Sequence, residues 1–253
     1  EDWKNYDYSS FNAIVHVAGI VHQPNCKDWE LYKRVNTDIP EKIATMAKEQ
    51  GVKHYIYFST MGVYQADKKL EASVVDETTP LLSNSKSLYG MSKLMAEEAL
   101  SKLQNEDFSV AFVRPPSVYG KGCKGGYITG FTSIVRLLPI IPKAYLNARQ
   151  SFIYIDNLSE CVRLIVENHL NGVFCPQDDE IPNANELFET IAQGLNKKYR
   201  DSRLLGLLMQ IVSFIPVGKK AYGGIAYSRT LSDIEGYDYV VVPFKEGMRR
   251  TVS

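Results

Sequence analysis

The stretch "NAIVHVAG" (residues 12–19) decides the fold class. Its apolar run ends in two small residues, which predicts a strand of a parallel sheet that is buried on both faces. Outward along the chain, "KHYIYFST" (53–60) and "FSVAFVRPP" (108–116) predict two further strands of this kind. Helical spacing occupies residues 28–51, which end at a glycine stop, and residues 87–100. This alternation predicts an α/β protein with a parallel sheet and right-handed crossovers.

The pattern changes after Pro116. A glycine-rich loop (117–130) comes first, and "QSFIYIDNLSECVRLIVENH" (150–169) then predicts a strand feeding a helix, with Asp156 or Asn157 near the cap. No internal repeat or low-complexity linker is visible. The sequence therefore predicts two lobes that interleave rather than join through a hinge.

Composition narrows the class of protein. The 253 residues carry 29 Lys+Arg and 29 Asp+Glu, and this balance argues against a nucleic-acid-binding protein. The four cysteines are scattered without a C-x-x-C pair or a His cluster, so we expect no metal site and a reduced, cytoplasmic chain. The most apolar run (204–218) is interrupted by Gln210 and Ser213 and stopped by Pro216, which predicts a packed helix and not a membrane span.

The stretch "SLYGMSKLMAEEAL" (87–100) contains a candidate acid/base pair. Tyr89 and Lys93 are four residues apart and so share one face of the predicted helix. A phenol titrates near about 10, and a neighbouring cation lowers that pKa, which would suit general acid/base chemistry. An exposed aromatic residue beside a surface lysine is the alternative that this spacing leaves open.

Polar and small residues follow each predicted strand. Ala18-Gly19 end the first strand, Ser59-Thr60 the second and Arg114-Pro115-Pro116 the third, while Tyr89 and Lys93 begin the helix before the third. Ligands bind beyond the carboxyl ends of strands in an open parallel sheet. We therefore expect a hydroxyl, a phenol and an ammonium to converge at one edge of the sheet.

With these segments in order, the chain resembles the extended short-chain dehydrogenase/reductases, in the NAD-dependent sugar-nucleotide epimerase/dehydratase branch of the UDP-glucose 4-epimerase type. The resemblance implies a Rossmann-like doubly wound sheet. It implies that residues 1–118 form part of an NAD(P)-binding domain and that residues 119–253 form mainly a substrate-binding lobe, interleaved with it. It further implies a cytoplasmic homodimer. The matching motifs are "AIVHVAG", "RVNTD", "YIYFSTMGVY", "DETTPL", "YGMSK", "VRPPSVYGKG" and "SFIYIDNL".

The family roles fall on particular residues of this chain. The resemblance implies that Tyr89 is the catalytic acid/base, that Lys93 lowers its pKa and holds the nicotinamide ribose, and that Thr60 binds the sugar hydroxyl that is oxidised. The implied cofactor-binding residues are Val17, Ala18, Gly19, Asn36, Ser59, Tyr89, Lys93 and Pro115. A cap or turn role for Asn36 and a strand-end hydroxyl role for Thr60 remain open.

The implied substrate-binding residues are Thr60, Ser117, Tyr127, Arg149 and Gln150. The family often places an arginine just before the "SFIYIDNL" strand to bind a diphosphate bidentately. Gln150 stands at that position here and Arg149 precedes it, so Arg149 either binds substrate from a shifted position or is a surface residue.

The largest departure from the family lies in the N-terminal residues of this sequence. The family opens with a strand, a G-x-x-G-x-x-G turn and a helix that binds the pyrophosphate, whereas these residues open at "EDWKNYDYSSFNAIVHVAG". We expect the first βαβ unit and its glycine-rich site to be missing from these residues and to belong to a longer parent protein. Residues 120–125 match G-x-G-x-x-G, but no acidic residue ends a strand about 20 residues later, so we expect this loop to shape the substrate pocket.

The resemblance implies a 4-epimerase that oxidises sugar C4 transiently, which requires Tyr, Lys, Ser/Thr and NAD. The expected substrate is a UDP-hexose or UDP-N-acetylhexosamine for cell-surface polysaccharide synthesis. A 4,6-dehydratase would carry Asp-Glu after the catalytic Thr, where this chain has Met61-Gly62. A keto-sugar reductase or dehydrogenase with the same triad is the alternative, and an inactive NAD-free binding module is the less favoured one.

Overall fold

The computed structural model describes residues 2–21, 26–83, 87–123, 126–211 and 221–253. The chain divides into two compact units. Unit 1 comprises Glu1–Gln65, Pro80–Pro115 and Cys161–Cys175, and unit 2 comprises Ala66–Thr79, Pro116–Glu160 and Pro176–Ser253. Each unit therefore contains segments from both sides of the boundary near residue 118 that we expected from the sequence.

Unit 1 contains a parallel sheet. Its strands β1 (Ala13–His16), β2 (His54–Phe58), β4 (Ser109–Val113) and β8 (Gly172–Phe174) lie in the order β1-β2-β4-β8. All three pairings are parallel, with Ile14 opposite Tyr55 and Ile56 opposite Ala111. The predicted α/β fold with a parallel, Rossmann-like sheet is confirmed.

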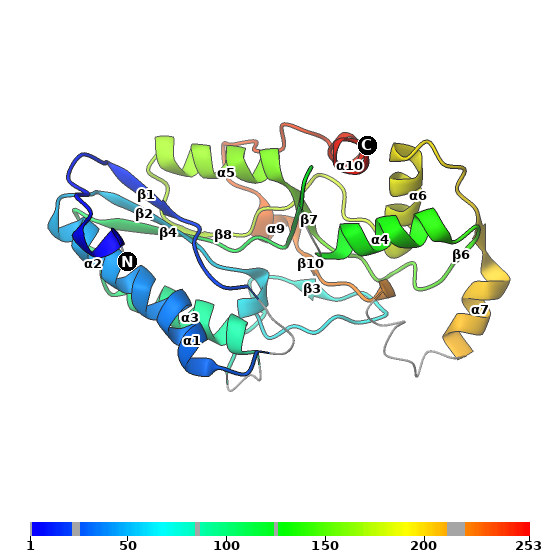
Figure 1. Ribbon diagram of the computed structural model, residues 1–253, viewed down its shortest axis with the longest axis horizontal. Helices are drawn as coiled ribbons and strands as arrows, with labels where there is room; N and C mark the ends of the chain where they lie inside the picture. Colours follow the sequence, from blue (N-terminus) through cyan, green and yellow to red (C-terminus); the bar gives the residue numbers. More distant parts are fainter. Residues whose placement is uncertain (1, 22–25, 84–86, 124–125, 212–220) are drawn as a thin grey trace. The chain divides into compact units, whose positions relative to one another are not determined.

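Helices cover one face of this sheet (Figure 1). They are the continuous run of α1 (Trp29–Lys33), the π-helix η2 (Arg34–Asp38) and α2 (Ile39–Glu49), followed by α3 (Leu88–Ser101). Unit 1 also contains two short 3-10 turns, η1 (Asp2–Asn5) and η3 (Met61–Val63). The core between sheet and helices consists of Ala44, Tyr55, Tyr57, Ala96, Leu100, Phe108, Val110 and Phe112.

Strand β1 differs from its prediction of burial on both faces. It is an edge strand of the described sheet, and Val15 is 41% exposed. His16, the next residue, points to the opposite face and is buried. An apolar run alone does not distinguish a strand buried on both faces from a strand buried on one face. The sequence looks the same whether or not another element packs on the second face.

Unit 2 is built on three short parallel pairs of strands. They are β3 (Val74–Val75) with β10 (Ala226–Tyr227), β5 (Ser117–Tyr119) with β7 (Phe152–Tyr154), and β6 (Ile141–Pro142) with β9 (Asp201–Ser202). Helix α6 (Ala184–Gly194) packs beside α4 (Gly126–Leu137) and α10 (Phe244–Val252) (Figure 1). Helix α9 is a single turn (Arg229–Ser232). The unit's core includes Tyr119, Phe131, Phe152, Phe188, Ile191, Phe244 and Met248.

Helix α5 (Ile155–Glu167) follows β7 directly, as the sequence predicts. Its Asn157 does not cap the helix. The buried Asn157 amide donates to Asp178 Oδ1 and to the Val242 carbonyl, both at 2.8 Å, and thereby joins distant segments of unit 2.

Helix α7 (Arg203–Ile211) contradicts the prediction of a packed apolar helix for residues 204–211. Leu204 is 68% exposed and Leu207 is 58% exposed. The contact that holds the helix uses Gly206, where an added Cβ would lie 1.9 Å from the Lys143 carbonyl oxygen. Residues 212–218 of that prediction lie outside the described residues. None of the described helices is long and apolar enough to cross a bilayer.

Candidate active site

The Thr60 hydroxyl lies beside the Tyr89 phenol in unit 1, close enough to lower the pKa of that phenol. Thr60 directly follows β2 and caps η3, where its Oγ accepts from the Gly62 N–H at 3.1 Å. Tyr89 lies in the first turn of α3, whose cap Ser87 accepts from the Gly90 N–H at 3.2 Å. Local capping thus fixes the backbone that carries each hydroxyl.

The lack of a side chain at Gly90 allows the first turn of α3 to contact η3. A Cβ at Gly90 would lie 2.4 Å from the Gly62 carbonyl oxygen, so no larger residue fits without moving the backbone. The start of α3 therefore packs directly against η3. This contact explains structurally why a glycine follows Tyr89 in the YGMSK motif.

Lys93 is a buried residue and not a surface lysine. Its ammonium donates to the Phe58 carbonyl at 2.7 Å and lies 4.6 Å from the centre of the Tyr57 ring. Burial lowers the pKa of Lys93 to about 8, and the nearby Glu97 carboxylate opposes that change. The ammonium is therefore still mostly charged at neutral pH.

Burial raises the pKa of the Tyr89 phenol, and the hydrogen bond with Thr60 opposes this rise. The sequence led us to expect Lys93 to be the group that favours the phenolate. In the structure Thr60 supplies the interaction that favours it, while Lys93 donates to the carbonyl of Phe58, the last residue of β2. The assignment of Tyr89, Lys93 and Thr60 as catalytic residues stays a prediction that this geometry is compatible with.

Asn36 holds the turn that follows β1 through hydrogen bonds. Its Oδ1 accepts from the Ile20 N–H at 2.9 Å, and its Nδ2 donates to the Ile20 carbonyl at 3.0 Å. Nδ2 also donates to Ser92 Oγ on α3, at 3.1 Å. Asn36 lies inside the π-helix η2, so it is not an N-cap. A Cβ at Gly19 would lie 2.9 Å from Asn36 Oδ1 and 3.2 Å from Lys93 Nζ, so the glycine leaves room beside both groups.

His16 supports the same turn, and the sequence interpretation did not identify it. Its Nε2 lies 3.1 Å from the Ala18 carbonyl and its Nδ1 lies 2.7 Å from the Tyr55 hydroxyl. A carbonyl only accepts, so we assign the proton to Nε2, and Nδ1 accepts from Tyr55. Burial lowers the pKa of His16 to about 4, and the Lys93 ammonium adds to this effect. The only available signal was a polar residue inside an apolar strand.

The remaining predicted cofactor residues lie around this turn and after β2 and β4. Val17, Ala18 and Gly19 are exposed, and Pro115 is buried. Ser59 is also buried, and its hydroxyl has no hydrogen-bond partner within the described part of the chain. A buried polar atom of this kind is uncommon and costs free energy unless a ligand or water satisfies it.

A buried ion pair holds α3 to the sheet of unit 1. Arg114 at the end of β4 donates through Nε to Glu97 of α3 at 3.0 Å and through Nη1 to the Tyr64 hydroxyl at 2.8 Å. Both charged side chains are almost fully buried. The sequence interpretation placed Arg114 at the strand end without recognising this structural role.

Unit 2 brings three of the predicted substrate residues together around Lys68, which the sequence interpretation missed. Lys68 Nζ donates to Gln150 Oε1 at 2.8 Å and lies 3.6 Å from the centre of the Tyr127 ring. Gln150 Nε2 in turn donates to Ser117 Oγ at 3.2 Å. We call these four residues the Lys68 cluster.

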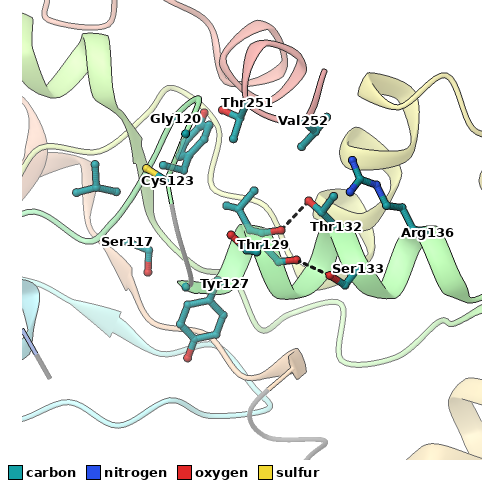
Figure 2. A pocket seen from close by; sticks show the side chains of 15 residues that line it. Ser117, Gly120, Cys123, Tyr127, Thr129, Thr132, Ser133, Arg136, Thr251 and Val252 are labelled. Carbon is teal, nitrogen blue, oxygen red and sulfur yellow. Dashed lines mark hydrogen bonds between the residues drawn. The ribbon is translucent and has the colours of Figure 1, made fainter. Parts of the chain in front are cut away.

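A pocket of about 210 Å³ adjoins this cluster, and Figure 2 shows Ser117 and Tyr127 among its lining residues. The loop at Gly120, Gly122 and Cys123 forms part of the wall, as expected for a loop that shapes a pocket. Residues 124 and 125 of the G-x-G-x-x-G match lie outside the described residues.

Arg149 does not join the Lys68 cluster. It is exposed, and its guanidinium donates to both carboxylate oxygens of Glu186, at 3.0 and 3.1 Å, and to the Ile181 carbonyl. This geometry matches the surface alternative that the sequence left open.

Comparison with known proteins places these features in a family. The sequence model of the NAD dependent epimerase/dehydratase family matches residues 5–174. A UDP-glucose 4-epimerase of Vibrio cholerae is 26% identical over 191 residues, which cover 73% of this chain and 57% of that protein. An N-acetyl-alpha-D-glucosaminyl-diphospho-ditrans,octacis-undecaprenol 4-epimerase of Escherichia coli O157:H7 is 27% identical over 208 residues, or 79% of this chain and 60% of that protein. The chain thus spans less than two thirds of the length of these curated relatives.

Solved structures share the fold. The UDP-glucuronic acid 4-epimerase from Bacillus cereus in complex with NAD superposes with a TM-score of 0.71 at 17% identity, covering 100% of this chain and 78% of that one. The UDP-N-acetylglucosamine 4-epimerase from Methanobrevibacter ruminantium M1 gives a TM-score of 0.69 at 23% identity, covering 100% and 80%. On the match to more than half of its residues, the chain belongs to the NAD-dependent epimerase/dehydratase family.

Proposed function

We propose that the protein is an NAD-dependent nucleotide-sugar 4-epimerase that acts by transient oxidation at sugar C4. The observation that carries this proposal is that the Thr60 hydroxyl lies beside the Tyr89 phenol, one helical turn along α3 from the buried Lys93, in a chain of this family. A hydroxyl donor, a phenol and a cation are the groups that removal and return of a hydroxyl proton require.

The residues of unit 1 fit the nicotinamide half of NAD. The buried Ser59 hydroxyl lacks a partner among the described residues, the Lys93 ammonium can donate to ribose hydroxyls, and Gly19 keeps side-chain bulk away from the turn. Asn36 and His16 hold this turn in place. When bound, NAD supplies the hydride acceptor and donor. The family resemblance supports three further contacts to NAD, which are Val17, Ala18 and Pro115.

In this proposal Thr60 orients the sugar 4-hydroxyl and the Tyr89 oxygen takes and later returns its proton. Burial holds the Tyr89 pKa above its ordinary value, so the phenolate needs help at neutral pH. The Thr60 hydroxyl favours the phenolate directly. The Lys93 pKa of about 8 keeps the Lys93 ammonium mostly charged at neutral pH.

The substrate class follows from the relatives. One relative is named for UDP-glucose and the other for an N-acetylglucosamine joined by a diphosphate to undecaprenol. Both are sugars carried on a diphosphate. We propose a UDP-hexose or UDP-N-acetylhexosamine used for cell-surface polysaccharide synthesis, handled by a cytoplasmic homodimer.

The test is incubation of the full-length protein with UDP-glucose and, separately, UDP-N-acetylglucosamine. Chromatography measures the 4-epimer, and absorbance measures NADH. Epimer formation without net NADH change supports the proposal. A net change in NADH would instead indicate a dehydrogenase or reductase, and no turnover with either substrate would indicate a binding module.

A further inference from the structure

Lys68 has an unusual environment for a lysine. Its ammonium lies over the ring of Tyr127 and donates to the side-chain amide of Gln150. Burial lowers the pKa of Lys68 to about 7, and burial is its single cause. Its neighbour Lys69 is exposed. Two adjacent lysines thus point into different environments.

Within the described ranges of the chain, the Lys68 charge has no counter-ion. Among the described residues, no carboxylate oxygen lies within ion-pair distance of Lys68, whereas Lys143 in the same unit pairs with Asp201 at 2.7 Å. A half-buried ammonium that meets only a neutral amide and a ring is poorly compensated. An anion bound beside Lys68 would supply the missing charge.

The hydrogen bonds around Lys68 leave two donors available. Gln150 accepts from Lys68 through Oε1 and donates to Ser117 through Nε2, which fixes the orientation of its amide. Ser117 Oγ therefore acts as an acceptor, and its own O–H finds no acceptor in the described part of the chain. The ammonium likewise keeps hydrogens beyond the one given to Gln150. An ammonium and a hydroxyl donor within one cluster suit a phosphate oxygen.

We propose that Lys68 is the cation that binds the substrate diphosphate, with Gln150 and Tyr127 positioning it and Ser117 donating beside it. This inference rests on the proposed function for the identity of the ligand. Gln150 occupies the position at which an arginine was expected, and a neutral amide cannot neutralise a phosphate. The charge is supplied instead from Lys68, which lies 82 residues earlier in the chain.

The first test compares two adjacent lysines in the full-length protein. Calorimetry measures the binding of UDP and of uridine to the wild type, Lys68→Met and Lys69→Met. We expect Lys68→Met to weaken UDP binding about tenfold to hundredfold, as expected for loss of a charge-assisted bond. Uridine binding should be unchanged, and Lys69→Met should stay within about twofold. Equal UDP affinity in Lys68→Met and the wild type would overturn the proposal.

A charge-conserving variant separates binding from folding. Lys68→Arg keeps a cation, so we expect UDP affinity within about threefold of the wild type and an unchanged melting temperature. If Lys68→Met does not fold, Lys68→Gln and Lys68→Arg form the comparison. A loss of UDP affinity as large in the Arg variant as in the neutral one would show that charge is not the cause, and would overturn the proposal.

The pH dependence of binding gives an independent readout. An anion raises the Lys68 pKa, so binding takes up a proton and affinity falls as pH rises through about 7. The groups facing Lys68 are Tyr127, whose pKa is raised by burial, and the neutral Gln150 and Ser117. UDP-N-acetylglucosamine is the probe, because its diphosphate diester does not titrate between pH 6 and 8. Its affinity should fall over this range in the wild type and stay level in Lys68→Arg, and a level wild-type profile would contradict the proposal.

The outcomes separate this inference from the proposed function. Diphosphate binding that depends on Lys68, in a protein without epimerase activity, would refute the proposed function and support the binding site. Epimerase activity together with Lys68-independent binding of UDP would support the function and overturn the site.

Discussion

The two units hold their polar groups in different ways. In unit 1, Thr60 and Tyr89 are carried by capped turns whose backbones touch through Gly90. In unit 2, Lys68, Ser117, Tyr127 and Gln150 come from four separate segments and meet through single side-chain contacts. The pair proposed for catalysis is thus held by local backbone constraints, while the cluster proposed for binding is assembled by tertiary packing.

Two ion pairs, one in each unit, differ in how deeply they are buried. The Arg114–Glu97 pair of unit 1 is almost fully buried and joins β4 to α3. The Arg149–Glu186 pair of unit 2 is about half exposed. A buried charge that loses its partner stays desolvated, whereas an exposed one returns to water. We therefore expect substitution in the buried Arg114–Glu97 pair to have a larger effect on stability than substitution in the exposed Arg149–Glu186 pair.

The largest effect is expected for Tyr89→Phe, which removes only the phenol oxygen. Epimerase kcat should fall at least about a hundredfold, the usual loss when a positioned acid/base group is removed. The melting temperature should be nearly unchanged, because the ring stays in place. Tyr6→Phe is the control, since Tyr6 is exposed. Turnover equal to the wild type in Tyr89→Phe would remove Tyr89 from the catalytic role.

The next effect concerns stability. Glu97→Gln keeps the shape of the side chain but leaves the buried Arg114 charge without its carboxylate, and should cost about 3–5 kcal/mol in the free energy of unfolding. Glu186→Gln, its exposed counterpart, should cost no more than about 1 kcal/mol. Urea titration measures both. Similar costs for the two variants would mean that burial does not distinguish these ion pairs.

The sequence predicts the features that depend on local spacing. The parallel strands, the helix at Tyr89 and the Tyr89–Lys93 face follow from periodicity and motifs within short windows. Other features depend on what packs against a segment. The exposure of one face of β1, the exposure of the α7 leucines and the half-buried position of the Lys68 ammonium depend on tertiary packing, which a short window of sequence does not contain.

His16 combines both kinds of feature. The sequence shows a polar residue within the strand, but it does not show what that residue contacts. Its pKa of about 4 lies below the ordinary value, so unfolding takes up a proton at acidic pH. Its stabilising contribution is complete above about pH 6.5 and is lost as pH falls toward 4. Between pH 6.5 and 5 the loss should reach about 2 kcal/mol.

The measurement is urea unfolding at several pH values in this range for the wild type and His16→Asn. The variant should be less stable at pH 7 and should lose less stability on acidification. His54, another buried histidine with a lowered pKa, keeps its own contribution in both proteins. An identical slope of stability against pH in both proteins would show that His16 does not carry this dependence.

The smallest effect is expected for Arg149→Gln, which sharpens the contrast with Lys68. Both residues are cations that could bind a diphosphate. Arg149 is exposed and already donates to both carboxylate oxygens of Glu186. Lys68 has no carboxylate partner among the described residues. An exposed guanidinium engaged in this way gains little by exchanging one anion for another. Calorimetry with UDP should therefore give an affinity within about twofold of the wild type for Arg149→Gln, measured beside Lys68→Met in the same buffer. A tenfold loss in Arg149→Gln, with Lys68→Met unaffected, would assign diphosphate binding to Arg149, and Glu186 would then have to release it when the substrate arrives.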